Sequence, residues 1–304
     1  MRIVFFGECM LEHCDSGAFR YGGDTLNTAL YLARMAEPGK LQVRYATALG
    51  DDADSQTLLQ NWQSEGLDTA LVLQLADKLP GRYRIYTDDK GQRRFQYWRD
   101  DSAARHYLRE ANNPLLSLLK EQGCDYVYLS GISLAILSPE HRQRLLDALT
   151  EFCRSGGKLI FDNNFRPVLW RDDPLPWYEK AMQLAYLALL TDEDEYALYG
   201  GDSVDAILAR TADIPYVLIK RGAQPCIIRS RKELSHVAGQ RVAKVVDTSA
   251  AGDSFAAGFL SAWLCGADIE TAVTTGHRLA ARVIQYPGAI IAAEAMQDLM
   301  PIKE

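Results

Sequence analysis

Short apolar runs rich in Val, Ile and Leu alternate along the chain with segments whose apolar residues recur at helical spacing. Runs that are apolar throughout are typical of parallel strands buried on both faces. The predicted strands are 3–6, 43–49, 126–129, 159–161, 186–190 and 216–220, and the predicted helices are 25–35, 56–65, 139–154, 193–199, 204–210, 254–264 and 269–284. This order predicts a single α/β domain over residues 1–304, with a doubly wound, mostly parallel sheet flanked by helices.

Two segments interrupt this alternation. Residues 8–21 form a polar connection between the first strand and the first helix, and residues 80–99 have the pattern of a hairpin with its turn at 88–91. We expect both segments to form a small β-sheet lid inserted in the main domain. Residues 82–109 carry seven Arg and one Lys against four Asp, which favours a lid that faces an anionic substrate. A solvated ribbon with its long side chains outside is the alternative.

Composition narrows the class of protein. With 304 residues, 48% of them hydrophobic, the chain can bury a large core. A net charge of -7 argues against nucleic acid or a membrane surface as a partner, so an anionic ligand has to be met by local basic groups. The six cysteines lack metal-site spacing and are expected to be reduced, and a first strand without a basic leader predicts a cytoplasmic protein.

Residues 245–253, with the sequence VVDTSAAGD, are expected to join a strand to an apolar helix through a turn of small residues. Ala250, Ala251 and Gly252 have almost no side chain, so backbone N–H groups there can approach a ligand closely. The positive end of the following helix favours phosphate at the same place. A carboxylate in this corner suits the deprotonation of an alcohol beside a phosphoryl group, which makes Asp253 a candidate general base. An ordinary helix N-terminus is the alternative.

A diglycine immediately precedes the first predicted helix. Gly23 permits close approach of a ligand, Asp24 or Thr25 can cap the helix, and Asn27 falls within its first turn. Asp24 can only accept hydrogen bonds when ionised, whereas Asn27 both donates and accepts, and together they suit the hydroxyl groups of a carbohydrate. A capped helix without a ligand is the alternative.

These two segments, GGDTLNTA and DTSAAGD, resemble in order and separation the two signature regions of the ribokinase-like sugar kinases, the phosphofructokinase-B family. The resemblance spans nearly the whole chain. Within the family, the segments 23–27 (GDTLN), 97–99 (YWR), 102–105 (SAAR) and 162–167 (DNNFRP) are similar to those of 2-keto-3-deoxygluconate kinases. The resemblance implies a kinase that uses ATP and Mg²⁺ to phosphorylate a small sugar acid at its terminal hydroxyl.

The resemblance also assigns roles to particular residues. For the substrate it implies that Gly23, Asp24 and Asn27 contact the hydroxyls. Arg99 and Arg166 are implied to bind the carboxylate or keto end, and Tyr86 and Tyr97 to be contacts from the lid. For catalysis it implies that Asp253 is the base and that the turn from Ala250 to Gly252 binds phosphate. It implies that Glu195 is an indirect ligand of Mg²⁺ through water. The implied nucleotide contacts are Lys220, Gly222, Gly252 and His277. A surface role is the alternative for each Arg and for His277.

Other functions remain open at this point. A fructokinase-like member of the same family is the nearest alternative, and a non-catalytic sensor of sugar or nucleotide is an alternative of a different class. A dinucleotide-dependent dehydrogenase is disfavoured because no Gly-x-Gly-x-x-Gly follows the first strand. There is also no Gly-x-x-x-x-Gly-Lys-Ser/Thr loop, and the five His give no zinc site. The sequence leaves open the exact sugar, a monovalent-cation requirement near Asp247 and a homo-oligomer.

Overall fold

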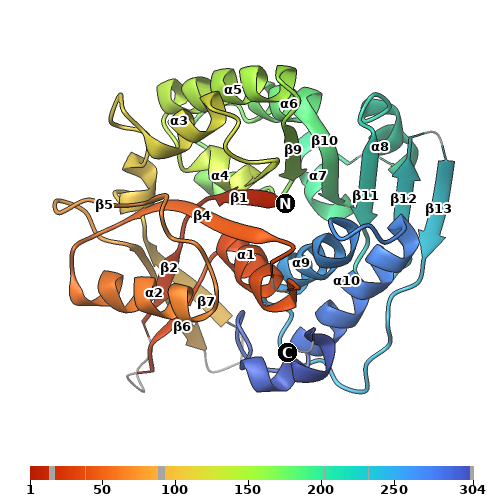
Figure 1. The fold of residues 1–304 in the computed structure, drawn as a ribbon. Helices are drawn as coiled ribbons and strands as arrows, with labels where there is room; N and C mark the ends of the chain where they lie inside the picture. Colours follow the sequence, from red (N-terminus) through yellow and green to blue (C-terminus); the bar gives the residue numbers. More distant parts are fainter. Residues whose placement is uncertain (14–17, 38, 88–92, 202, 232, 302–304) are drawn as a thin grey trace.

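The computed structural model describes residues 1–13, 18–37, 39–87, 93–201, 203–231 and 233–301. Its main sheet has nine strands in the order β13-β12-β11-β10-β9-β8-β1-β4-β5 (Figure 1). In chain order these strands are β1 (Arg2–Phe6), β4 (Gln42–Leu49), β5 (Val72–Gln74), β8 (Tyr126–Ser130), β9 (Lys158–Asp162), β10 (Ala185–Thr191), β11 (Tyr216–Lys220), β12 (Cys226–Ser230) and β13 (Glu233–Val237). Neighbouring strands from β5 to β11 are parallel, and β12 and β13 add an antiparallel hairpin at the edge.

Helices cover both faces of this sheet (Figure 1). One face carries α1 (Asp24–Met35), α2 (Ala53–Ser64), α9 (Ala251–Trp263) and α10 (Ile269–Val283), and α9 packs against both α1 and α10. The other face carries α3 (Pro114–Lys120), α4 (Gly131–Ala135), α5 (Pro139–Arg154), α6 (Leu175–Leu184), α7 (Asp192–Tyr199) and α8 (Val204–Arg210). Short 3₁₀ helices occur at η1 (Ala103–His106), η2 (Pro167–Leu169) and η3 (Ala293–Leu299). The predicted doubly wound α/β fold is confirmed.

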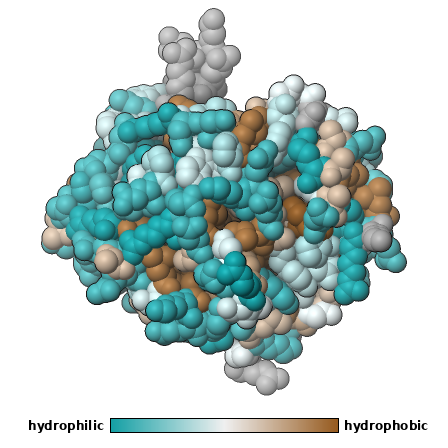
Figure 2. Space-filling model, turned by 90° about the horizontal axis from the view of Figure 1, so that it is seen from above, coloured by the Kyte–Doolittle hydropathy of each residue, from teal (hydrophilic) through white to brown (hydrophobic). Residues whose placement is uncertain are grey.

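Strand β1 shows why the central strands are apolar throughout. Ile3 and Phe5 enter the core on the α1 and α9 side, and Val4 and Phe6 enter the core on the α5 side, all without exposed surface. Alternate side chains of a strand point to opposite faces, so a sheet covered on both faces needs apolar residues at every position. Hydrophilic residues predominate on the outer surface seen in Figure 2, where hydrophobic residues form small separate patches. No helix in the described ranges is long and apolar enough to span a bilayer.

Within the described residues, a second sheet has four strands in the order β3-β2-β6-β7. They are β2 (Met10–Glu12), β3 (Arg20–Gly22), β6 (Gly81–Thr87) and β7 (Arg93–Trp98). The two segments predicted to form a lid, 8–21 and 80–99, therefore meet in one sheet, because β2 pairs with β6. The predicted turn at 88–91 lies outside the described residues, and movement of this sheet as a lid stays a prediction.

The prediction of a strand before the turn of small residues at 250–252 is wrong. Val245 and Val246 form no strand, and their side chains are 53% and 41% exposed. The N–H groups of Val246 and Asp247 donate instead to the carbonyl of Ile284 at the end of α10. Two β-branched residues favour extended backbone, but a strand also needs a neighbouring strand, which this segment lacks. The following helix starts at Ala251, three residues earlier than predicted, so Asp253 lies in its first turn.

The strand order also indicates where on the sheet a ligand could bind. From β1 the chain passes to β4 and β5 on one side, and it then returns to β8 on the other side and continues to β11. Open α/β sheets bind ligands beyond the carboxyl ends of the strands at such a reversal of strand order. The residues at or just after these ends are polar: Glu8 after β1, Ser130 at the end of β8 and Asp162 at the end of β9.

Candidate active site

The turn that begins α9 has backbone N–H groups available for a ligand. Ala250 adopts the left-handed conformation, with φ 58° and ψ 19°, and its side chain makes no capping hydrogen bond. The N–H of Ala251 donates to the carbonyl of Thr248 at 3.2 Å, whereas the N–H groups of Gly252 and Asp253 have no acceptor within the described part of the chain. Because free N–H groups and the helix dipole both favour an anion, this turn can bind phosphoryl oxygens.

Asp253 lies in this first turn, facing α1. The Nδ2 atom of Asn27 donates a hydrogen bond to Asp253 Oδ2 at 2.8 Å. Burial raises the pKa of Asp253 to about 8, and the negative charges of Asp24 and Asp162 add to the rise, while Asn27 and Lys220 oppose it. A carboxyl group with a pKa near the working pH is suited to act as a general base.

The first turn of α1 brings the three predicted hydroxyl-binding residues next to Asp253. The carbonyl of Gly23 accepts the N–H of Asn27 at 2.7 Å, and the carboxylate of Asp24 accepts Nδ2 of Asn164 at 2.8 Å. Asn164 Oδ1 is buried and has no hydrogen-bond partner among the described residues, so it is an acceptor that a ligand hydroxyl could use. Sequence reasoning did not single out Asn164, although its place just after a predicted strand was a usable signal.

Lys220 lies beside the turn that begins α9. Its Nζ atom is 2.8 Å from Asp162 Oδ2, and the hydroxyl of Tyr128 donates to the same oxygen at 3.0 Å. A Cβ atom added to Gly252 would be 3.6 Å from Lys220 Nζ, so the ammonium group lies beside the backbone of the turn. This position favours contact with phosphate. Asp162 is a second residue to which sequence reasoning gave no role of its own, although it comes directly after the predicted strand 159–161.

The other two predicted nucleotide contacts, Gly222 and His277, come from different elements. Gly222 follows β11 and has a positive φ of 55°, which favours glycine. His277, on α10, is half-buried, and its ring centroid is 5.0 Å from that of Phe255. Burial lowers the pKa of His277, and its Nε2 has no hydrogen-bond partner in the described ranges. A neutral imidazole with a free nitrogen could bind a base, but both nucleotide roles stay predictions.

Glu195 is buried and held by two side chains. Asn163 Nδ2 donates to Glu195 Oε1 at 3.1 Å, and Arg210 Nη2 donates to Glu195 Oε2 at 3.1 Å. Within the described residues no group of three or more His, Cys, Asp or Glu is arranged to hold a metal ion. The arrangement is compatible with an indirect role through water, which stays a prediction.

The two arginines predicted to bind a carboxylate differ in their surroundings. Arg99 is buried and its Nη2 forms an ion pair with Glu8. Arg166 is half-exposed, and its Nη1 donates to Asp194 Oδ1 at 3.0 Å and to the carbonyl of Phe165 at 2.7 Å. Removing Arg99 would leave the buried Glu8 without its counter-charge, so its loss would disturb the fold as well as any ligand.

The register of the hairpin separates the two predicted lid contacts. Tyr83 pairs with Tyr97, and Tyr86 pairs with Arg94. Directly paired residues share a face of a sheet, and residues three apart along one strand lie on opposite faces. The prediction that Tyr86 and Tyr97 together contact one substrate therefore has to be corrected, because these two side chains lie on opposite faces.

Two glycines identify the face that looks toward the site. A Cβ added to Gly22 would be 3.4 Å from Asn27 Oδ1, and one added to Gly81 would be 2.8 Å from Glu8 Oε1. Gly22 and Gly81 share a face because both pair with Met10. By alternation along β6, this face also carries Tyr83 and its partner Tyr97. Tyr83 is thus the second tyrosine of the site face, and Tyr86 points away from the site.

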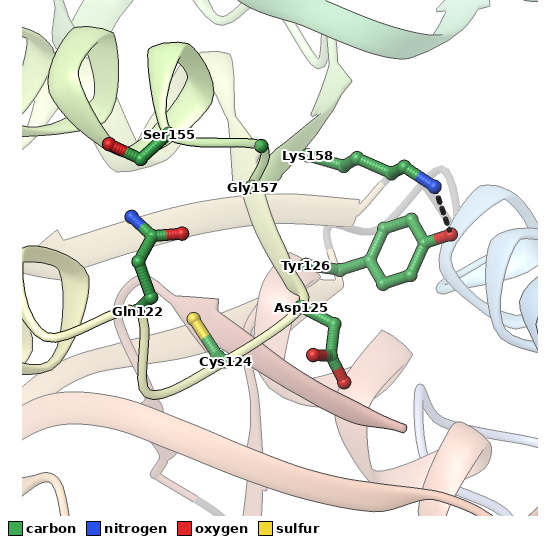
Figure 3. A pocket seen from close by; sticks show the side chains of 8 residues that line it. Gln122, Cys124, Asp125, Tyr126, Ser155, Gly157 and Lys158 are labelled. Carbon is green, nitrogen blue, oxygen red and sulfur yellow. Dashed lines mark hydrogen bonds between the residues drawn. The ribbon is translucent and has the colours of Figure 1, made fainter.

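A pocket of about 340 Å³ lies by the amino ends of β8 and β9, whereas the candidate active site lies beyond the carboxyl ends of the strands (Figure 3). Lys158 Nζ approaches Tyr126 Oη at 3.3 Å there, and the Lys158 ammonium also lies over the ring of Tyr186. None of the predicted site residues lines this pocket, whose lining is Gln122, Cys124, Asp125, Tyr126, Ser155, Gly156, Gly157 and Lys158. It is separate from the candidate active site.

Comparison with known proteins agrees with this geometry. Residues 4–296 match the family model described as pfkB family carbohydrate kinase. The chain is 46% identical over 304 residues to the 2-dehydro-3-deoxygluconokinase of Dickeya dadantii (strain 3937) and 45% identical over 305 residues to that of Escherichia coli (strain K12). Each alignment covers 97% of this chain and 98% of the relative.

Solved structures show the same fold. The crystal structure of 2-dehydro-3-deoxygluconokinase from Thermotoga maritima aligns with a TM-score of 0.80 at 20% identity, covering 98% of this chain and 99% of that one. The family match covers the segments that supply Asn27, Lys220 and Asp253 to the site. The chain therefore belongs to the pfkB family of carbohydrate kinases.

Proposed function

We propose that the protein transfers a phosphoryl group from ATP, with Mg²⁺, to the terminal hydroxyl of 2-keto-3-deoxygluconate, giving 2-keto-3-deoxy-6-phosphogluconate. The observation that carries this proposal is Asp253, a carboxyl group with a pKa of about 8, in a turn where the N–H groups of Gly252 and Asp253 have no acceptor among the described residues. The choice of substrate is supported by 45–46% identity to relatives named 2-dehydro-3-deoxygluconokinase.

The roles of the residues follow from their positions. Asp253 accepts the proton of the substrate hydroxyl as its oxygen attacks phosphorus, and Asn27 holds the carboxylate of Asp253 in place. The free N–H groups of Gly252 and Asp253, with Lys220 below them, stabilise negative charge on the transferring group. ATP supplies that group and Mg²⁺ neutralises part of its charge.

The remaining polar groups position the sugar. Asp24 and Asn164, hydrogen-bonded to each other, offer a carboxylate and a free amide oxygen to its hydroxyls. Tyr83 and Tyr97 cover it from the second sheet, whose closure would keep water away from the phosphoryl group. A cytoplasmic location, a homo-oligomer and a monovalent cation near Asp247 stay predictions.

The pH dependence of kcat/KM should report the raised pKa of Asp253. The base works only when deprotonated, so kcat/KM for 2-keto-3-deoxygluconate should rise with pH and level off above about 8. Initial rates between pH 5.5 and 9.5, at a constant excess of MgATP, measure this profile. A flat profile across this range would contradict the assignment of the raised pKa to the catalytic base.

The two faces of the hairpin predict different effects for two tyrosines. Tyr97→Ala should raise KM for the sugar about tenfold, because it removes a side chain from the face that looks toward the site. Tyr86→Ala is the matched control and should leave KM within about twofold, since Tyr86 lies on the other face. Steady-state kinetics of both variants measure KM for the sugar, and equal changes in KM would show that the assignment of faces is wrong.

The proposed function is tested by a coupled assay of ADP release with a panel of sugars. We expect kcat/KM to be highest for 2-keto-3-deoxygluconate and much lower for neutral sugars such as fructose. A preference for fructose would favour the fructokinase-like alternative. No ADP release with any sugar would favour the non-catalytic sensor.

A further inference from the structure

The carboxylate of Asp162, at the end of β9, accepts three hydrogen bonds. Its Oδ2 atom accepts from the hydroxyl of Tyr128 at 3.0 Å and from the ammonium of Lys220 at 2.8 Å. Its Oδ1 atom accepts from the N–H of Asn164 at 3.3 Å. Asp162 is 5% exposed, so these donors have to compensate for most of the water that the carboxylate loses on burial.

The carboxylate of Asp162 is held in place by its surroundings. β9 is paired with β8 on one side and with β10 on the other, and Asp162 takes part in both ladders. Alternation along β9 places its side chain on the same face as Ile160, which lies in the core with α1 and α9. The ring of Tyr128, whose hydroxyl binds Asp162, packs with its centroid 4.7 Å from that of Phe5. Asp162 is therefore a fixed anchor for any side chain that binds it.

Lys220 is the flexible member of the ion pair with Asp162. Its ammonium is carried on four methylene groups, so a partner is needed to select one position for it. The two side chains are 12% and 7% exposed, which makes the pair a buried one. A Cβ added to Gly252 would be 3.6 Å from the ammonium, in the turn where the N–H groups of Gly252 and Asp253 have no acceptor among the described residues. An anion bound in this turn would therefore meet the ammonium as well as the N–H groups.

We propose that Asp162 is a positioning residue that holds the Lys220 ammonium beside the turn that begins α9, where it contacts the phosphoryl groups of ATP. This inference rests on the proposed function. Asp162 supplies the counter-charge that a buried ammonium needs, and a bound phosphate then shares that ammonium. Asp162 acts on the reaction through Lys220 and not by a contact of its own with the phosphoryl group.

The first variant is Asp162→Asn, which removes the charge and preserves the size of the side chain. Its amide oxygen can still accept the N–H of Asn164, but its NH₂ group then faces the ammonium of Lys220. We expect kcat/KM for MgATP to fall about 10- to 100-fold, with KM for the sugar within about threefold. Asp125→Asn is the matched control, because Asp125 is ion-paired with Arg2 at the other end of the sheet, and it should behave as the wild type.

A double-mutant cycle with Lys220→Met separates positioning from general damage. Lys220→Met alone should lower kcat/KM for MgATP at least as much as Asp162→Asn does. If Asp162 acts through Lys220, adding Asp162→Asn to Lys220→Met should change kcat/KM for MgATP by no more than about threefold. Losses that multiply would overturn the inference, and so would an unchanged kcat/KM in Asp162→Asn alone.

Thermal melts report on the ion pair independently of activity. Lys220→Met leaves the buried carboxylate of Asp162 without its counter-charge, whereas the double variant removes both charges. The double variant should therefore have a higher Tm than Lys220→Met, and a lower Tm would overturn the inference. The comparison of these two variants, in Tm and in kcat/KM, does not require Asp162→Asn alone to fold.

Failure of the proposed function would be visible separately. A wild-type protein that does not phosphorylate 2-keto-3-deoxygluconate would contradict that function. Calorimetric binding of MgATP to the wild type, both single variants and the double variant would still decide the role of Asp162. We expect Asp162→Asn to weaken binding in the wild-type background and to change it little in the Lys220→Met background, and equal weakening in both backgrounds would overturn the inference.

Discussion

Replacing Asp253 with Asn should lower kcat for 2-keto-3-deoxygluconate by about 10²- to 10⁴-fold. The amide nearly preserves the size of the side chain and can still accept the hydrogen bond from Asn27, but it cannot take the proton of the attacking hydroxyl. The KM of both substrates should change little, because the backbone N–H groups and Lys220 remain in place. Coupled ADP release gives kcat, and near-normal turnover would remove Asp253 from the role of base.

Thermal melts of Asp253→Asn give a second readout that does not depend on activity. Folding raises the pKa of Asp253 from 3.8 to about 8, so between these values the folded protein holds a proton that the unfolded chain releases. The stability contributed by this proton is complete at low pH and is lost as the pH rises through about 8. The variant should therefore gain Tm relative to wild type at pH 9 and show a smaller gain at pH 5. A gain at pH 5 that matches the gain at pH 9 would contradict the raised pKa.

Replacing Gly23 with Ala should both destabilise the protein and abolish most of its activity. The added Cβ would be 2.0 Å from the Glu8 carbonyl oxygen and 3.1 Å from the Glu8 carbonyl carbon, which are backbone atoms that cannot rotate away. Either α1 or the connection after β1 has to move, and both carry groups of the site. We expect a loss of about 2 kcal/mol or more in the free energy of unfolding and a fall of more than about 10²-fold in kcat/KM.

The neighbouring glycine provides the control for this prediction. A Cβ added to Gly22 would come no closer than 3.4 Å to another atom, so Gly22→Ala should cost clearly less stability than Gly23→Ala. Denaturant unfolding and steady-state kinetics of both variants measure the difference. Equal stability of Gly23→Ala and wild type would show that the close contact between α1 and the connection after β1 is not required.

Patterns local in the sequence predicted the central strands and the candidate base. The strands are buried on both faces, so each leaves an uninterrupted apolar run, as in β1 and β11. Asp253, Gly23 and Asn27 stand in short segments next to helix starts, where residue type and position already indicate a ligand. These features depend on a few neighbouring residues, which is why the sequence alone could suggest them; the roles of the three site residues stay predictions.

The missed features depend on contacts between distant parts of the chain. Glu8 and Arg99 are 91 residues apart, and Asp162 and Lys220 are 58 apart, so no local pattern pairs them. The face occupied by Tyr86 is set by pairing with β2, and a residue one position away would face the other side. The β12 and β13 hairpin was also missed, since it turns at Arg231 with φ 56° where no glycine marks the turn.

The environment of Asp253, the proposed base, explains why its pKa could not be predicted from the sequence either. Asp24 comes from α1 and Asp162 from β9, and both carboxylates raise the pKa of Asp253 only because the fold brings them near it. Such a cluster of acidic groups opposes folding, and enzymes commonly accept this cost at a site of catalysis. The same proximity would make Asp253 effective as a base near neutral pH.

The most direct test of the account is to identify the product formed from 2-keto-3-deoxygluconate and MgATP by the wild-type protein. We predict one equivalent of ADP and one of 2-keto-3-deoxy-6-phosphogluconate, with the new phosphate coupled to the terminal CH₂ group in a ³¹P–¹H correlation spectrum. Failure to consume the sugar acid, or a phosphate at any other position, would contradict the claim that Asp253 activates its terminal hydroxyl.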